Sequence, residues 1–453
     1  MGLMFRGFYF ILLVCLTAGQ VSAQGIITTI AGNGHTEYIG DGHPATNFAL
    51  GGPAGLCLDR HNNLYIANLY TSRVSKLAHD TLSTVVDTSG NSGYSGDGGL
   101  ADSATVTNPI GVCMDTAGNL YVTDVYYDVI RMVNTEGFIS TICGSGMGGY
   151  GGDNGPGVSA QLNKPHGAFP DSKGNLYIAD YENHRIRRLN LATGIISTFA
   201  GTGTSGPATD NVQATASQIS YPSSVCTDRY DNVYFAEHGN HRIRKVDAVT
   251  GIITTVAGNG SQDYLGDGNV AVQAALNQPN GVYVDNYGFI YISDYGNNVV
   301  RAVSPQGIIA TIAGVFDSSG WSGDGGAAIQ ATFQGPTAVC VDNAGNIYIA
   351  DGDNSLIRRV TPIKFPNAGI GQTGMPSLRI YPNPAANGRF TVCLPGSLQV
   401  ASVTVTNAIG RCVYAGQING SIGTIDISRE GPGMYYLQTV TPGGSFLSKI
   451  VVE

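Results

Sequence analysis

The chain has 453 residues, of which 12% are charged and 64 are glycine, and its formal net charge is −9. Few charges combined with many glycines indicate a turn-rich all-β protein rather than a helical or disordered one. The negative balance argues against nucleic acid as a partner, because phosphate binding needs a basic surface. The length accommodates one large repeat domain and a smaller second domain.

The first 23 residues have the pattern of a secretory signal peptide. Arg6 precedes an apolar run from Phe8 to Ala18, and the small residues Val-Ser-Ala at 21–23 form a cleavage site. We therefore expect the protein to be exported. No later apolar run reaches about 18 residues, so no membrane span is expected.

After the signal peptide, the sequence repeats at an interval of 56 or 57 residues. An aspartate in a glycine-rich loop recurs at Asp41, Asp97, Asp153, Asp210, Asp267 and Asp324. A tyrosine recurs at Tyr65, Tyr121, Tyr177, Tyr234, Tyr291 and Tyr348. Each unit contains four short apolar segments separated by turn residues, which is typical of antiparallel strands. Six such units predict an all-β, six-bladed β-propeller.

The repeat is out of phase with the chain ends. The segment from Ile26 to Ala31 has the pattern of a fourth strand, but no first three strands precede it. The sixth unit ends at Val360 without a fourth strand. We therefore expect the N-terminal strand to complete the sixth blade beside Ser355–Val360, which would close the ring and remove its exposed sheet edges.

The sequence pattern changes after the sixth unit. Residues 362–377 contain several Pro and Gly without periodicity and predict a linker. Residues 378–453 contain alternating segments such as GRFTV at 388–392 and TIDIS at 424–428. These alternating segments predict a small β-sandwich.

Two families resemble these segments. The recurring motifs GDG-x-x-A, GNLYIAD, NHRIR and GIITTVAG resemble the NHL repeat family from Gly25 to Val360. This resemblance implies a six-bladed propeller used mostly for binding, with a few enzyme relatives. The C-terminal motifs, from IYPNPA at 380–385 to KIVV at 449–452, resemble the type A sorting domain of type IX secretion cargo. That resemblance implies the type IX secretion machinery as a partner and a location at the outer-membrane surface or outside the cell.

The two resemblances together predict four parts of the chain: a signal peptide (1–23), a six-bladed propeller (24–361), a linker (362–377) and a C-terminal sorting domain (378–453).

The cysteines are expected to be structural. Four of them, Cys57, Cys113, Cys226 and Cys340, occupy one repeat position at which the other blades have Phe169 and Tyr283. Equivalence to aromatic residues indicates burial as small hydrophobic groups rather than disulfide or metal chemistry. A bridge between Cys393 and Cys412 in the C-terminal domain stays open, because the sequence does not give their separation.

Most recurring polar residues have a structural explanation. The aspartates that end each first strand are expected to bond the following turn. The acids after each second strand recur with an arginine in the third strand, which indicates ion pairs within the blade; these are Asp124, Asp180, Glu237, Asp294 and Asp351, with Arg131, Arg187, Arg244, Arg301 and Arg358. Calcium held by these acids is the less favoured alternative, because no segment has EF-hand spacing.

An aromatic residue precedes the loop aspartate by three positions in five of the six units. These residues are Tyr38, Tyr94, Tyr150, Tyr264 and Trp321. A ring of aromatic side chains on one face would anchor a protein or stack on sugars. Repetition favours the alternative, in which each ring packs over its own loop.

The mouth of the central channel is expected to be lined by the residue after the first proline of each blade. These residues are Ala54, Ile110, His166, Ser223, Asn280 and Thr337. His166 and Asn280 are the candidate ligand-binding members. His166 with His184 and Asp180, or with neighbouring His238, is the one cluster that resembles a metal site, yet a catalytic zinc needs three protein ligands.

The sequence favours a secreted or cell-surface binding protein whose propeller face holds an unknown protein or glycan. No cofactor is predicted, and calcium and zinc are the alternatives considered above. The other functional reading is an enzyme of the lactonase or lyase type, with a metal site at the channel mouth.

Overall fold

The computed structural model describes residues 25–36, 41–361, 379–381, 388–393, 400–407, 412–419, 422–430, 433–441 and 444–452. The predicted signal peptide, Tyr38 and the predicted linker lie outside the described residues. The chain forms one compact unit from Gln24 to Ile363 and a second that contains Lys364–Glu453.

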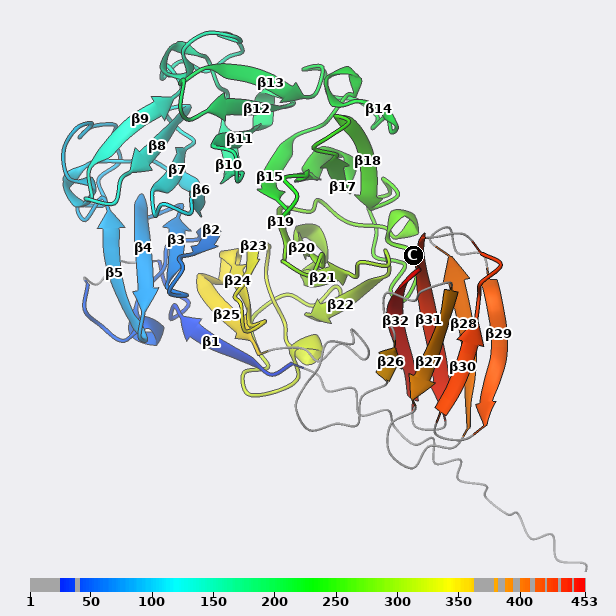
Figure 1. Ribbon diagram of the computed structural model, residues 1–453. Coiled ribbons are helices and arrows are strands. Elements are labelled where there is room, and N and C mark those ends of the chain that lie inside the picture. The colour runs from blue at the N-terminus through cyan, green and yellow to red at the C-terminus, as the bar shows by residue number, and fades with distance from the viewer. Residues whose placement is uncertain are drawn as a thin grey trace, which may run out of the picture. The chain divides into compact units, whose positions relative to one another are not determined.

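The first unit is a ring of six antiparallel sheets, shown from blue to yellow in Figure 1. The first three blades consist of β2 (Pro53–Leu58), β3 (Leu64–Asn68), β4 (Arg73–Ala78) and β5 (Thr81–Val86); β6 (Pro109–Met114), β7 (Leu120–Asp124), β8 (Val129–Val133) and β9 (Ile139–Cys143); and β10 (Pro165–Pro170), β11 (Asn175–Asp180), β12 (Arg185–Asn190) and β13 (Ile196–Ala200).

The last three blades complete the propeller, as the repeats predict. They consist of β15 (Pro222–Thr227), β16 (Val233–Glu237), β17 (Arg242–Val246) and β18 (Ile252–Ala257); β19 (Gly281–Val284), β20 (Ile290–Asp294), β21 (Val299–Val303) and β22 (Ile309–Ala313); and β23 (Pro336–Val341), β24 (Ile347–Asp351), β25 (Leu356–Val360) and β1 (Ile27–Ala31). The fourth blade has an additional outer strand, β14 (Val212–Gln213), paired with β18.

The predicted closure of the ring is confirmed. β1 pairs antiparallel with β25, with Ile27 opposite Val360 and Thr29 opposite Arg358 (Figure 1). The loop of the sixth blade adds a side-chain bond, because the backbone N–H of Thr29 donates to Asp324 at 3.0 Å. The N-terminal strand is thus held by both the sheet and the loop.

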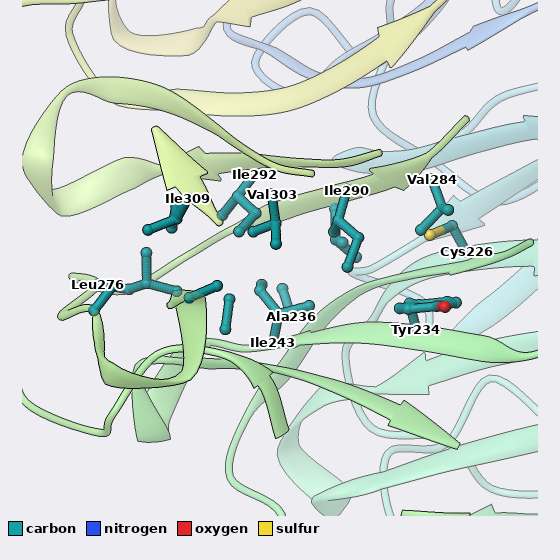
Figure 2. Close-up of a cluster of buried hydrophobic side chains, with 14 residues drawn as sticks. Cys226, Tyr234, Ala236, Ile243, Leu276, Val284, Ile290, Ile292, Val303 and Ile309 are labelled. Carbon is teal, nitrogen blue, oxygen red and sulfur yellow. The ribbon is translucent and has the colours of Figure 1, made fainter. Parts of the chain in front are cut away.

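The hydrophobic core lies between neighbouring blades rather than in one centre. Figure 2 shows Ile290 and Ile292 of the fifth blade facing Ala236 and Ile243 of the fourth. Cys226 lies in the same cluster. Cys57, Cys113, Cys143, Cys226 and Cys340 are all buried free thiols, and burial raises the pKa of Cys226. The predicted burial of Cys57, Cys113, Cys226 and Cys340 is confirmed.

The second unit is a small two-sheet β domain. One sheet has the order β26 (Arg379–Tyr381), β27 (Arg389–Cys393) and β30 (Ile422–Asp426). The other has the order β29 (Cys412–Asn419), β28 (Val400–Asn407), β31 (Gly433–Thr441) and β32 (Gly444–Val452). Phe390, Val405 and Leu437 pack between the sheets. The side chains of Cys393 and Cys412 lie outside the described part, so their bridge stays a prediction.

Helical structure in the described residues is limited to 3-10 turns of three residues, such as η4 (Tyr181–Asn183) and η6 (His238–Asn240). No described helix has the length and apolar character to cross a membrane.

Candidate functional site

The propeller has two different faces. We call the first the loop face; it carries the glycine-rich loops between blades and the turns between second and third strands. We call the other the turn face; it carries the turns between first and second strands. Each glycine-rich loop connects one blade to the next and lies over the blade that follows it. For example, the Gly98 N–H donates to the backbone carbonyl of Ile139 in β9 at 2.8 Å.

A fully buried arginine organises each of the second to sixth blades. In the third blade, Arg187 contacts Asp180 at 3.1 Å and the loop aspartate Asp153 at 2.7 Å. Burial raises the pKa of Asp180 to about 6, against the opposing effect of Asn183, Asn163 and Arg187. In the fourth, fifth and sixth blades, the equivalent arginine contacts both the equivalent second-strand acid and the equivalent loop aspartate. The predicted pair between the second-strand acid and the arginine is thus present in the third to sixth blades. The further pair between the arginine and the loop aspartate holds the preceding glycine-rich loop on the second to sixth blades.

The first blade replaces this charged group by a neutral one. Asn68 occupies the position of the second-strand acid, Ser75 that of the arginine, and the Asn68 amide donates to the Ser75 hydroxyl at 3.0 Å. A neutral hydrogen bond can occupy this site because it leaves no unpaired charge in the interior.

Two aromatic residues of the loops, Tyr150 and Tyr264, contact the aspartate of their own loop, which agrees with the packing that their repetition favours. The Tyr150 hydroxyl donates to Asp153 at 2.9 Å, and the Arg185 guanidinium lies 3.6 Å from the ring centroid. Tyr264 bonds Asp267 in the same way and stacks on Phe316. Tyr94 lies over Arg131. Tyr94, Tyr150 and Trp321 are 41%, 44% and 56% exposed, so packing does not remove these three rings from the surface.

The predicted channel residues line one narrow cavity. Its walls contain Ala54, Ile110, His166, Ser223, Asn280 and Thr337. Ser223 and Thr337 use their hydroxyls to bond backbone carbonyls of the next blade, at 2.8 Å to Asn280 and to Pro53. Among the described residues, His166 and Asn280 keep side-chain polar groups without hydrogen-bond partners. They are the members of this ring that can bond a ligand.

An arc of rings surrounds the loop-face end of the channel. His166 stacks on Tyr181, with centroids 3.9 Å apart and planes 13° apart. Tyr221 and His238 flank Tyr181 at 5.0 Å and 6.3 Å, and Tyr295 lies 6.5 Å beyond His238. Burial, followed by the His238 imidazole, lowers the pKa of His166 to about 3. His166 is therefore uncharged near neutral pH.

The alternative of a metal cluster made of His166, His184 and Asp180 is not supported by the positions of these side chains. Asp180 is held inside its blade by Arg187 and Asn183. The His184 ring turns toward the next blade, where its Nδ1 accepts the backbone N–H of Tyr221 at 3.2 Å. His166 lies against Tyr181 instead. Within the described residues, no group of three His, Cys, Asp or Glu side chains could hold a metal ion.

Sequence reasoning missed most of the arc. Tyr181, His238 and Tyr295 occupy the first position of their turns, where the other blades have Leu69, Val125 and Gly352. This difference between blades was a signal in the sequence. The stacking of His166 on Tyr181 had no such signal, because it depends on the turn conformation.

Known families match both units. Residues 162–189 and 333–359 match the NHL repeat, and residues 88–148 and 257–320 match the Teneurin NHL domain. Residues 379–453 match the secretion system C-terminal sorting domain. The chain carries NHL repeats and a secretion sorting domain. The sorting domain indicates type IX secretion, so this NHL-repeat protein is exported to the cell surface or the extracellular space.

Curated relatives match parts of this chain. The chain is 30% identical over 228 residues to Protein SUPPRESSOR OF QUENCHING 1, chloroplastic, of Arabidopsis thaliana, covering 48% of this chain and 22% of that protein. It is 27% identical over 264 residues to human NHL repeat-containing protein 2, covering 51% and 36%. The NHL-repeat protein thus spans well under half of the length of these relatives.

Solved structures share the fold. A protein of unknown function from Bacteroides thetaiotaomicron matches with a TM-score of 0.55 and 20% identity, covering 74% of this chain and 75% of that one. An auxiliary nutrient binding protein from the same organism matches with a TM-score of 0.53 and 19% identity, covering 74% and 76%. At these identities the likeness concerns the fold alone.

Proposed function

We propose that this exported propeller is a binding module whose loop face holds a protein ligand. The observation that carries the proposal is the set of exposed apolar side chains on that face, which includes six of the nine exposed aromatic rings of the described propeller. These side chains come from the glycine-rich loops and from the turns between second and third strands. They include Tyr70, Tyr94, Tyr126, Met147, Tyr150, Leu265, Phe316 and Trp321. An exposed apolar surface of this kind is typical of an interaction site.

The shape of the channel mouth favours a large ligand over a small one. The cavity has a volume of about 70 Å³, whereas pockets that enclose small molecules have roughly 300–1,000 Å³. A ligand therefore lies across the loop face rather than inside the channel. Tyr181, His238 and Tyr295 would act as its central anchors, because aromatic side chains bury a large area at little entropic cost.

A photo-crosslinking amino acid tests this surface in the producing cell. Placed at Tyr126 or Trp321, it should yield one discrete protein adduct, whereas at Tyr287 on the turn face it should yield none. Tyr287 is a matched control because its ring is equally exposed, at 65% against 67% for Tyr126. Adducts with polysaccharide alone would favour the glycan ligand instead, and equal adducts from both faces would refute the proposal.

The anchors can be tested once the partner is captured. Tyr181→Ala and Tyr295→Ala should each weaken binding by about 1 to 3 kcal/mol. Thermal melting of each variant shows whether the fold survives. The lactonase- or lyase-type alternative makes a different prediction, because His166→Ala would then abolish turnover of the substrate while leaving capture of the protein partner unchanged.

A further inference from the structure

A second and larger cavity opens on the turn face. It has a volume of about 590 Å³, which lies within the rough 300–1,000 Å³ of small-molecule pockets. Its walls come mainly from the first, second and sixth blades. Arg60, Thr116 and Asn343 are in the turns between first and second strands, and Tyr65 and Lys76 are on β3 and β4. It lies at the opposite end of the channel from the arc of rings around His166 and Tyr181.

The cavity lies where the first blade departs from the repeat. In the other five blades, the recurring tyrosine donates its hydroxyl to the turn aspartate of its own blade, at 2.9 to 3.3 Å. In the first blade, the Lys76 ammonium approaches Asp59 at 3.8 Å and lies 5.3 Å from the Tyr65 ring centroid. No hydrogen bond of the Tyr65 hydroxyl occurs among the described residues. Tyr65 is half-buried and contributes its ring to the cavity wall.

The hydrogen-bond acceptors of the three turn aspartates are already used. Asp115 accepts the N–H groups of Gly118 and Asn119, the Asn119 amide and the Tyr121 hydroxyl. Asp342 has the equivalent four donors, and Asp59 has three together with Lys76. A carboxylate offers about four acceptor sites, so these aspartates have little left for a ligand.

The groups that remain in the cavity can all donate hydrogen bonds, and the hydroxyl and amide groups can also accept them. The Arg60 guanidinium donates through Nε to His61 at 3.1 Å, which leaves its two terminal amino groups. The Tyr65 and Thr116 hydroxyls and the Asn343 amide have no partner among the described residues. A ligand for this cavity must therefore offer many oxygen acceptors and one apolar face for the Tyr65 ring.

We infer that the turn-face cavity is a binding site for a neutral sugar of one or two rings. Sugar hydroxyl oxygens accept hydrogen bonds from Arg60, Tyr65 and Asn343, and adjacent hydroxyls suit the fork of a guanidinium. The C–H face of a sugar ring packs on the Tyr65 ring. A charged sugar is disfavoured, because Asp59, Asp115 and Asp342 nearly balance Arg60 and Lys76 and provide no strong field of one sign.

Calorimetry on the full mature chain tests this site with maltose, cellobiose, lactose and galacturonic acid. We expect at least one neutral disaccharide to bind, and Arg60→Ala and Tyr65→Phe each to weaken its binding by about tenfold. Tyr65→Phe retains the ring and hence the packing. Arg229→Ala is the matched control, because Arg229 has the same turn position in the fourth blade and lies outside this cavity.

Hydrogen exchange gives a second measurement, with slower exchange expected at residues 59–65 in the presence of the sugar. The inference is overturned if no neutral disaccharide binds, or if galacturonic acid binds more tightly. It is also overturned if Arg60→Ala and Arg229→Ala have equal effects. Weakening by Tyr181→Ala alone would place the sugar at the loop face and likewise contradict this site, whereas failure of the protein-ligand proposal would leave it unaffected.

Discussion

At the scale of the residue, a position that recurs in every blade shows its role most clearly where one blade differs. Arg301 of the fifth blade is fully buried between Asp267 and Asp294, at 2.6 and 3.7 Å. The first blade has Ser75 and Asn68 at the equivalent positions and omits both charges. The ion pair therefore positions a loop and is not a feature that every blade needs.

Arg301→Met should lower the free energy of unfolding by about 3–5 kcal/mol, because it leaves the buried carboxylate of Asp294 without its arginine partner. Lys164→Met is the control, since the Lys164–Glu182 pair is exposed and should contribute about 0–1 kcal/mol. Chemical denaturation measures both. Equal effects would show that the buried arginine has no special role.

Two histidines should make the stability of the ring depend on pH. His184 and His241 use Nδ1 to accept a backbone N–H of the next blade, at 3.2 and 3.0 Å. Burial lowers the pKa of both below 6.5. In the unfolded chain these histidines therefore bind protons near pH 6.5, whereas in the folded chain they stay neutral at this pH. The free energy of unfolding thus falls as the pH drops below about 6.5.

The double variant His184→Asn, His241→Asn should flatten this pH dependence. Asparagine can accept the same bond, because Asn298 accepts the Gly335 N–H at 2.9 Å in the fifth blade. Denaturation at several pH values between 5 and 7 measures the slope. An unchanged slope would assign the pH dependence to other groups, such as His166 and His238.

At the scale of the element, the outermost strands contribute unequally. β1 completes the four-stranded sheet of the sixth blade, whereas β14 adds two residues to a sheet that already has four strands. An incomplete blade exposes an edge of unpaired backbone groups and the core beside it. The N-terminal strand therefore has a larger role than its length suggests.

Deletion of residues 26–31 should lower stability by several kcal/mol and promote aggregation. Val212→Pro in β14 is the control and should cost much less, because it disturbs only the added strand. Melting curves and light scattering measure the two effects. A deletion that melts like the intact ring would contradict closure by β1.

At the scale of the whole molecule, the two units have separate tasks. The propeller forms its cores between its own blades, and the C-terminal unit has its own buried cluster around Phe390 and Leu437. The folding of the propeller should therefore be separable from the sorting of the protein by its C-terminal domain.

A chain that ends at Thr361 should fold and bind its ligand but remain in the periplasm, because it has lost the sorting domain. Fractionation of the producing cells, with the full chain as control, measures the location. Truncated protein on the surface at normal levels would contradict the sorting role, and an insoluble truncated chain would contradict the boundary.

The sequence by itself determined the six blades, the closing strand, the channel-lining positions and the sorting domain. These follow from periodicity, because each blade buries apolar residues against the next and must repeat them. Only the tertiary structure decided which polar groups stay available. It turned His184 toward the next blade, placed His166 on Tyr181 and left Tyr65 without its aspartate. Such contacts join residues of different blades or turns, and their geometry depends on backbone donors that sequence spacing does not locate.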